Sequence, residues 1–459
     1  MTPFANARHL LALSVAALLV ATASPATADD HAQAEAKTGS VIFIHPDGVS
    51  SASWAVARAL GPGPDGDLHW DKLSHIALYR GHMLNSLTST SNGGATVHAT
   101  GVKPMHDAFG KIAAGQDAPR ILDAHGRYAS VAIQAISVGI PVGVVQSGSA
   151  IEPGTAVFLA EADARADHDT IVDRMLESGA QVILGGGERH FLPQGVEGTH
   201  GPGERTDGRN LVEEAQAKGY TVVTTRDELL ALPDDTGKVL GLFAHYHTFN
   251  DEPEEILEAA GLPQYDPEAP TVAEMTEVAL RLLSHTADQF LLVVEEEGTD
   301  NFGNNNNAPG TIEAMQRTDE CFGVALDHLA DHPDTLVVTA ADSDGGGLRL
   351  IGKRVDLDEP IEDQVDRRLQ PWRYNGAPQD GVSGTRSAHF IAAPNAQGHT
   401  LPFSVAWSSY ADVSGGVLVR AEGLNAERVT GSMDNTKIAE LIRLTLFGDP
   451  SFDGPPPAE

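Results

Sequence analysis

The stretch VIFIHPDGVSSASWAVARAL, residues 41–60, joins a short apolar run to a helical pattern through a polar turn. Residues 41–44 are all apolar, which is typical of a strand buried on both faces. A helix is expected from about Ser51 to Leu60, and the Gly-Pro repeat at 61–64 stops it. A buried strand followed at once by a helix is the unit from which parallel α/β sheets are built.

The same alternation continues along the chain. Further apolar runs that we expect to be strands lie at residues 142–145, 181–184, 220–224, 239–243, 290–294, 336–339 and 417–420. The clearest helical patterns between them lie at residues 169–178, 271–284, 311–329 and 435–446. We therefore predict an α/β fold, in which a large, mostly parallel central sheet is covered by helices on both faces.

The pattern favours one domain over residues 41–448, because no linker or internal repeat divides it. Residues 352–403 lack periodicity and are rich in Pro, Gly, Asp and Arg, so we expect an insertion there. The Pro-rich tail at 449–459 is expected to be disordered.

The chain opens with the pattern of a cleaved export signal. Arg8 precedes an apolar run over residues 10–20, and the Ala-Thr-Ala at 26–28 supplies small residues for cleavage. We predict a signal peptide at 1–28 and a polar leader at 29–40. No other apolar run approaches the ~20 residues that span a bilayer. The expected product is periplasmic or secreted, with no membrane attachment.

The net charge and the cysteine content argue against nucleic-acid binding and against a fold held by disulfides. The formal net charge is −34, from 64 acidic and 30 basic residues, so nucleic acid is not an expected partner. Such an acidic surface favours solubility, including in high salt, where self-repulsion is screened. Cys321 is the single cysteine, which excludes an intrachain disulfide.

A second stretch, STSNGGATVHATGVK at residues 89–103, is a hydroxyl-rich turn followed by a short helical pattern, and it could hold a serine nucleophile. Ser91 is expected just before a short helix that stops at Gly101. The free N–H groups and the dipole of a helix N-terminus favour an anion such as phosphate or sulfate. A serine there is more often only a helix cap, so these residues alone leave both roles open.

Carboxylates follow three of the predicted strands. They are Asp47, Glu295 to Glu297 with Asp300, and Asp342 with Asp344. Ligands of open α/β sheets bind at the carboxyl ends of the strands, where these groups would repel one another unless cations lay between them. A two-metal hydrolase needs such an arrangement. Turn and cap residues of an acidic protein are the alternative, which accounts for one cluster more readily than for three.

Several motifs in matching order resemble those of the alkaline phosphatases, over most of the mature length. The matching parts are Asp47-Gly48, Ser91 with residues 100–103, Arg165, residues 176–191, 206–230, 294–304 and 338–348, Trp407, residues 415–425, and residues 434–436. The resemblance implies an alkaline phosphatase-like fold, hydrolysis of small phosphate monoesters through a phosphoserine, bound divalent ions, and a homodimer.

The resemblance also assigns roles to residues. Ser91 matches the phosphorylated serine, and Arg165 matches the arginine that binds phosphate. The residues at metal-ligand positions are Asp47, Glu295, Asp300, Asn304, Asp342, Ser343, Asp412 and, one step out of register, Thr155. One ion would lie at Asp47 and Asp342, a second near Asp300, and a third, magnesium-like ion at Glu295.

The departures from the family concern zinc. Three histidines that bind zinc in the family are replaced here, by Asn304, Ser343 and Asp412. Oxygen donors suit hard cations, whereas imidazole suits zinc. We therefore expect Mg, with Ca or Mn as alternatives and Zn in doubt, and activity at alkaline pH.

Alternatives remain open at this point. The metal site has either been rebuilt for hard cations or has decayed, leaving a protein that binds phosphate or metal weakly. A phosphodiesterase or sulfatase of the same superfamily is a further alternative, although no Cys or Ser stands in the x-Pro-x-Arg context of a sulfatase nucleophile.

Other histidines offer a ligand from a new direction, although scattered histidines are mostly surface or core residues. They are His45, His82, His98, His245, His247 and His389. His389, within the expected insertion, is the first candidate among them.

Overall fold

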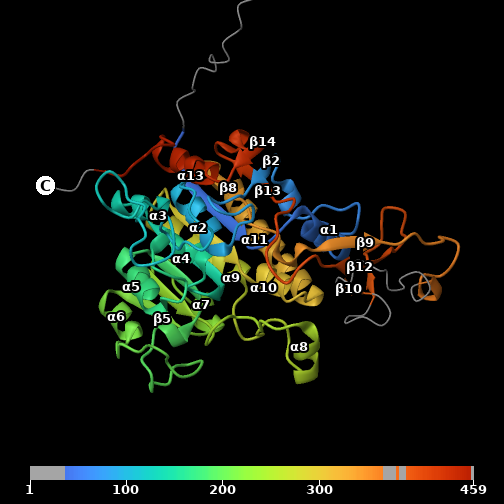
Figure 1. Ribbon diagram of the computed structural model, residues 1–459, viewed down its shortest axis with the longest axis horizontal. Coiled ribbons are helices and arrows are strands. Elements are labelled where there is room, and N and C mark those ends of the chain that lie inside the picture. The colour runs from blue at the N-terminus through green and yellow to red at the C-terminus, as the bar shows by residue number, and fades with distance from the viewer. Residues whose placement is uncertain (1–36, 365–378, 382–388, 456–459) are drawn as a thin grey trace, which may run out of the picture. The chain divides into compact units, whose positions relative to one another are not determined.

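The computed structural model describes residues 37–364, 379–381 and 389–455, which belong to one unit of the chain (Figure 1). The predicted signal peptide and most of the polar leader lie outside the described residues. Among the described residues, no helix combines the length and the apolar character that crossing a bilayer requires.

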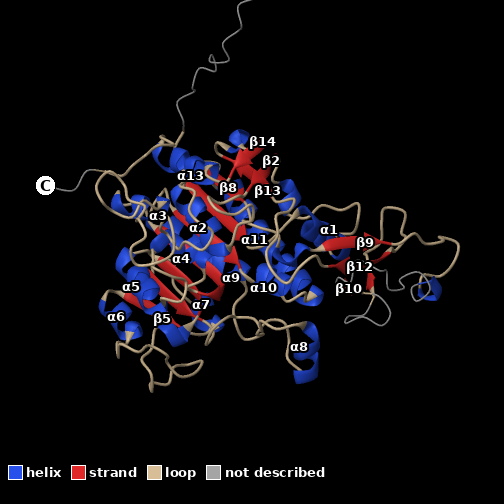
Figure 2. Cartoon of the chain, viewed as in Figure 1, coloured by secondary structure: helices blue, strands red, loops and turns tan. Residues whose placement is uncertain are grey.

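A ten-stranded sheet forms the centre of this unit, in the order β14-β2-β13-β8-β1-β7-β3-β4-β6-β5 (Figure 2). Its strands are β1 Ser40–Pro46, β2 His75–Arg80, β3 Val142–Ser149, β4 Val182–Gly186, β5 Tyr220–Val223, β6 Lys238–Leu242, β7 Leu291–Glu296, β8 Thr335–Thr339, β13 Leu418–Gly423 and β14 Gly431–Asp434. Every pairing from β8 to β5 is parallel. Only β13 runs antiparallel to its neighbours β8 and β2. The predicted α/β fold with a mostly parallel sheet is confirmed.

All eight strands that the sequence predicts are present, and β2 and β14 were missed. Strand β2 exposes alternate residues, including Ile76 and Leu78, because one of its faces is open to solvent. Strand β14 is a four-residue edge strand with only Met433 buried. Neither has the continuous apolar run that marks the central strands.

Helices cover both faces of the sheet. They are α1 Ser51–Leu60, α2 Ser91–Thr100, α3 Val131–Ser137, α4 Pro153–Leu159, α5 His168–Ser178, α6 Leu211–Ala217, α7 Arg226–Leu230, α8 Glu254–Ala260, α9 Val272–Thr286, α10 Gly298–Asn304, α11 Ala308–Asp331 and α13 Lys437–Phe447. Helices α2, α3, α4 and α13 pack together on one face, while α1, α9 and α11 pack together on the other (Figure 1). The central strand residues Val41 to Ile44 are therefore almost completely buried.

The strand register brings the predicted acidic clusters to one edge of the sheet. Strand β1 lies between β7 and β8, and Ile44 is level with both Val294 and Thr339. The three strands run in the same direction, so the residues that follow each of them meet at the same edge.

A separate antiparallel sheet lies where the insertion was expected. It consists of β9 Arg349–Gly352, β10 Gln379–Asp380, β11 Phe390–Ile391 and β12 Pro402–Ala406. Phe403, Val405 and Trp407 form an apolar cluster with Val56 of α1 and Ile312 of α11. Residues 365–378 and 382–388 of the expected insertion lie outside the described residues.

The C-terminal segment is in contact with the body of the protein as far as Pro455, where we expected a disordered tail from residue 449. Phe452 stacks on Phe447 with ring centres 4.0 Å apart. Arg127 donates to the carbonyl of Pro455 at 2.8 Å. An aromatic partner and hydrogen bonds from side chains to its backbone carbonyls contact this segment, and composition alone does not reveal either of them.

Candidate active site

Helix α2 begins one residue earlier than the sequence indicates. Its N-cap is Thr90, whose hydroxyl accepts a hydrogen bond from the N–H of Gly93 at 3.4 Å and donates to the carbonyl of His106 at 2.5 Å. Ser91 is the first helical residue, so of the two roles that the sequence left open for Ser91, the N-cap role belongs to Thr90. Because Thr90 does the capping, the hydroxyl of Ser91 is available for another partner.

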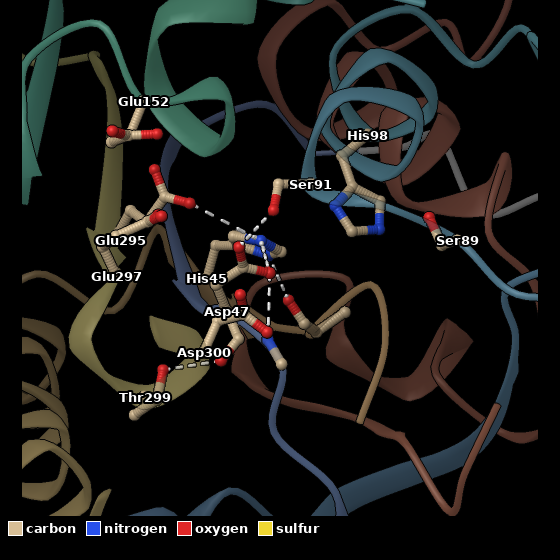
Figure 3. Close-up of polar contacts among 12 residues, drawn as sticks. His45, Asp47, Ser89, Ser91, His98, Glu152, Glu295, Glu297, Thr299 and Asp300 are labelled. Atoms are coloured by element: carbon tan, nitrogen blue, oxygen red, sulfur yellow. Dashed lines mark hydrogen bonds and ion pairs between the residues drawn. The ribbon is translucent and has the colours of Figure 1, made fainter. Parts of the chain in front are cut away.

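That partner is Asp47, at the end of β1. Ser91 is buried and donates from Oγ to Asp47 Oδ2 at 2.8 Å (Figure 3). Burial by itself would raise the pKa of Asp47, but its contacts with His45, Asp342 and Ser91 outweigh burial and hold the pKa below its usual value. Asp47 is therefore an anion that orients the serine hydroxyl.

Asp342 lies beside Asp47 and is equally buried. Neither of its carboxylate oxygens has a hydrogen-bond partner among the described residues. Burial and the neighbouring Asp47 raise the pKa of Asp342 well above its usual value. Gly94 of α2 allows this approach, because a Cβ there would lie only 2.3 Å from the Cβ of Asp342.

His45 completes this group, which we call the His45 cluster (His45, Asp47, Asp342). Its Nε2 lies 3.2 Å from Asp47 Oδ1 and 3.8 Å from Glu295 Oε1. One donor atom from each of the three residues lies within 4.8 Å of the others. His389, the first candidate among the histidines, instead donates to the carbonyl of Gly381 next to the second sheet, at 3.2 Å.

A second group, the Asn304 cluster (Asp300, Asn304, Asp412), brings together the residues predicted for the second ion. The Nδ2 of Asn304 donates to Asp300 at 2.9 Å and to Asp412 at 3.0 Å. Its Oδ1, the predicted ligand atom, accepts from the N–H of Gly346 at 2.8 Å. Burial raises the pKa of Asp412, and its contacts with Asp300, Asn304 and Ser343 offset only part of this rise.

Glu295 lies on the other side of Asp47, where the third ion was predicted. Burial raises the pKa of Glu295 to about 8. The amide of Gln146 donates to Glu295 and also to Thr155 Oγ1, at 3.5 Å for the latter. Gly154 faces the carboxylate directly, because a Cβ there would lie 1.9 Å from Glu295 Oε1. The structure thus separates Thr155 from Glu295 by one amide group.

Two further glutamates, Glu152 and Glu297, lie beside Glu295 (Figure 3). Asp47, Glu295 and Glu297 again offer donor atoms within 4.8 Å of one another, and both oxygens of Glu297 lack a hydrogen-bond partner among the described residues. Arg165 pairs with Glu152 and lies 3.7 Å from Glu297. The predicted phosphate-binding arginine therefore reaches this site, with 45% of its side chain exposed.

Sequence reasoning named His45 only as one of six histidines and Glu297 only as part of an acidic run, and it missed Glu152. A signal for His45 was available, because residues two apart on a strand point the same way and Asp47 was already a candidate. Glu297 stood in a recognised acidic run, whereas the position of Glu152 depends on how helix α4 packs.

These donors fit divalent ions. The carboxylate oxygens without partners belong to fully or nearly fully buried residues, which is costly unless a cation is held among them. The pKa of Glu297 and of Asp300 is likewise raised well above the usual value by burial, and then by neighbouring carboxylates. A bound cation would remove this repulsion.

Known proteins share this chain's pattern over nearly all of the described unit. A family model for alkaline phosphatase matches residues 38–447. The chain belongs to the alkaline phosphatase family. The membrane-bound alkaline phosphatase of Bombyx mori is 30% identical over 351 residues, covering 67% of this chain and 60% of that relative. The repressible alkaline phosphatase of Saccharomyces cerevisiae is 28% identical over 383 residues, covering 77% of this chain and 61% of that relative.

Alkaline phosphatases of known structure share the fold. The Thermus thermophilus alkaline phosphatase superposes with a TM-score of 0.69 at 23% identity, covering 92% of this chain and 94% of that one. A histidine-to-aspartate variant of TAB5 alkaline phosphatase, with Mg bound in its M3 site, superposes with a TM-score of 0.65 at 20% identity, covering 90% and 99%. At these identities the likeness bears on the fold alone.

Proposed function

We propose that this chain is an exported, metal-dependent phosphatase that hydrolyses phosphate monoesters through a phosphoserine at Ser91. The observation that carries the proposal is the 2.8 Å hydrogen bond from Ser91 Oγ to Asp47, at the N-terminus of α2 and at the centre of the carboxylate groups. Family membership supports the reaction class. The chain spans about 60% of the length of the first two relatives, 60% and 61% respectively, so their whole activity is not carried over.

The residues divide the work as follows. Ser91 Oγ attacks phosphorus and the ester oxygen leaves on the opposite side, after which water releases phosphate from the serine. Asp47 orients the hydroxyl but is a weak base, because its pKa is held low. Divalent ions at Asp47, Asp342 and Glu295 would lower the pKa of the serine hydroxyl and of water and neutralise the phosphate charge.

Arg165 binds the phosphate. Its guanidinium pairs with Glu152 and lies near Glu297, and nearly half of the side chain is accessible. A guanidinium in this setting can exchange a carboxylate for two phosphate oxygens in a bidentate contact. This positive group matters because the chain carries a net charge of −34, which otherwise repels an anionic substrate.

We propose Mg as the principal ion, with Ca or Mn as alternatives and Zn as the least favoured. Oxygen donors dominate, since the resemblance places Ser343 and Asp412 at positions of zinc-binding histidines.

The decisive experiment assays the mature chain after treatment with a chelator. Cleavage of a phosphate monoester, a diester and a sulfate ester is measured with Mg, Ca, Mn and Zn added separately. Monoester cleavage restored by Mg, Ca or Mn supports the proposal. Recovery with Zn alone contradicts the metal preference, preference for the diester or the sulfate ester contradicts the substrate class, and no turnover with any ion favours a binding protein.

A Ser91→Ala variant tests the nucleophile in the same assay. We expect no phosphoenzyme and a loss of activity of at least about 10³-fold, because a serine nucleophile is removed outright. Persistent labelling of the variant would contradict Ser91 as nucleophile and transfer that role to a neighbouring hydroxyl, such as Thr90 or Thr88.

Export is part of the proposal, with residues 1–28 as the cleaved signal. N-terminal sequencing of the protein recovered from the periplasm or the medium should begin at Asp29. Recovery of the uncleaved chain in the cytoplasm would contradict it. The homodimer expected from the family resemblance is tested by the mass of the purified protein in solution.

A further inference from the structure

The side chain of His45 is directed into the carboxylate groups by the sheet itself. His45 is the sixth residue of β1 and is level with Glu295 in the parallel pairing with β7. Asp47 follows two residues later, so both side chains leave β1 in the same direction. The imidazole is completely buried, and no rearrangement is needed to bring it to Asp47.

One ring nitrogen of His45, Nδ1, is already engaged in a hydrogen bond. Nδ1 lies 2.8 Å from the carbonyl of Ala340, two residues before Asp342. A carbonyl can only accept, so Nδ1 carries a hydrogen, and loss of the other ring proton leaves the lone pair of Nε2 available to a metal ion. Histidine ligands of metals are held in this way, with the second N–H donated to a carbonyl or carboxylate.

The second ring nitrogen of His45, Nε2, is directed toward a position that a cation could occupy. Nε2 has no hydrogen-bond partner among the described residues, yet it lies 3.2 Å from Asp47 Oδ1 and within reach of Asp342. Both oxygens of Asp342 also lack a hydrogen-bond partner among the described residues, and together with Asp47 these groups converge as the ligands of one ion do.

The neighbouring imidazole of His98 provides a comparison. Its ring packs against His45 at 5.4 Å, but its Nε2 is hydrogen-bonded to the hydroxyl of Tyr79 at 2.7 Å. Burial lowers the pKa of His98 well below the usual value, so it is a neutral core residue. The two buried histidines are therefore alike in burial and different in access to the carboxylates.

We propose that His45 is a nitrogen ligand of the divalent ion at Asp47 and Asp342, and that this position therefore also accepts a borderline metal such as Zn or Co. The inference deepens the proposed function, because this ion lies next to the nucleophile Ser91. It differs from the family plan in that the imidazole comes from the first strand.

The test uses the mature protein freed of metal and a His45→Asn variant. The asparagine amide keeps a donor for the carbonyl of Ala340 but removes Nε2. Binding of Co²⁺ and Mg²⁺ is measured by calorimetry, and the Co²⁺ complex by visible absorption. We expect His45→Asn to weaken Co²⁺ at least about tenfold and to change its spectrum, while Mg²⁺ binding changes less.

A His98→Gln variant is the matched control and should bind Co²⁺ with the wild-type spectrum. Wild-type affinity and spectrum in His45→Asn would overturn the proposal and leave His45 as an internal counter-ion of Asp47. Should His45→Asn fail to fold, X-ray absorption of the wild type with one equivalent of Zn²⁺ decides. Imidazole scattering supports the ligand role, and oxygen scattering alone overturns it.

The result is separable from the proposed function. Metal binding through His45 in a protein that cleaves no phosphate ester would contradict the phosphatase and leave the ligand intact. If the protein is an active phosphatase and His45→Asn binds Co²⁺ normally, the phosphatase proposal stands and the ligand role of His45 is contradicted.

Discussion

The His45 cluster and the Asn304 cluster have similar burial and charge but hold their carboxylates in different ways. In the Asn304 cluster, one amide donates to Asp300 and Asp412 and so links the two carboxylates without a cation. In the His45 cluster, both oxygens of Asp342 and the Nε2 of His45 have no such partner among the described residues. An amide can link two carboxylates by hydrogen bonding, whereas no described side chain donates to either oxygen of Asp342. The His45 cluster should therefore depend more strongly on its metal.

The largest contrast is expected from removing one carboxylate from each cluster. Asp47→Ala should reduce metal affinity by more than the roughly 100-fold that the loss of an outer partner costs, and should abolish activity, because Asp47 contributes to both candidate ion positions. Asp412→Asn should cost less, since Asn304 still binds Asp300. Calorimetry with Mg²⁺ and Mn²⁺ and the phosphate ester assay measure both. Equal losses in the two variants would remove the distinction between the clusters.

Removal of metal should make stability fall as pH rises. Burial raises the pKa of Glu295 to about 8, above its ordinary value of 4.5. Between these two values the folded chain binds more protons than the unfolded chain, so the free energy of unfolding decreases with increasing pH. In chelator, we expect Tm at pH 8 to lie about 3 °C or more below Tm at pH 6.

With saturating Mg²⁺ the same comparison should show a smaller difference, because the cation replaces the proton on the carboxylates. A metal-free protein whose Tm is unchanged or rises between pH 6 and pH 8 would contradict the buried, proton-binding carboxylates. Differential scanning calorimetry at matched ionic strength measures all four conditions.

A smaller effect should follow from removing the linking amide of the Asn304 cluster, so that its carboxylates, like those of the His45 cluster, depend on a cation. Asn304→Asp replaces the linking amide by a third carboxylate, which should destabilise the metal-free protein by roughly 1–3 kcal/mol. It should also raise the affinity for Mg²⁺ or Ca²⁺, because an oxygen ligand replaces an N–H donor. Ser343→Ala, which leaves the amide in place, is the control. A stabilised metal-free variant would show that the amide does not hold the two carboxylates together.

The central sheet was predictable because strands that are buried on both faces appear in the sequence as continuous apolar runs. Every run from residues 41–44 to 417–420 became a strand of the main sheet. The half-exposed β2 and the edge strand β14 lack that pattern, so only their pairing in the folded chain reveals them. The second sheet was hidden for the same reason, since β10 and β11 are only two residues long.

Site residues that directly follow a strand could be predicted from the sequence. Those whose position depends on contacts between distant parts of the chain could not. Asp47, Asp300 and Asp342 could be placed at one sheet edge by topology alone. The amide orientation of Asn304 depends on the N–H of Gly346, which no local pattern encodes. His45 was one of six scattered histidines, and its role depends on the carbonyl of Ala340, 295 residues away in sequence.

The smallest predicted effect concerns the cap of α2. This cap precedes Ser91, which is hydrogen-bonded to Asp47 of the His45 cluster. Thr90→Ala removes the side chain that accepts from Gly93 and donates to His106, and should cost about 1 kcal/mol of stability. Thr90→Ser retains the hydroxyl and should cost less than half of that. Chemical denaturation measures both, and Mg²⁺ affinity should be unchanged in each. If Thr90→Ala instead abolishes phosphoenzyme formation at full stability, Thr90 is the nucleophile and Ser91 only positions it, because a capping hydroxyl contributes to stability and not selectively to chemistry.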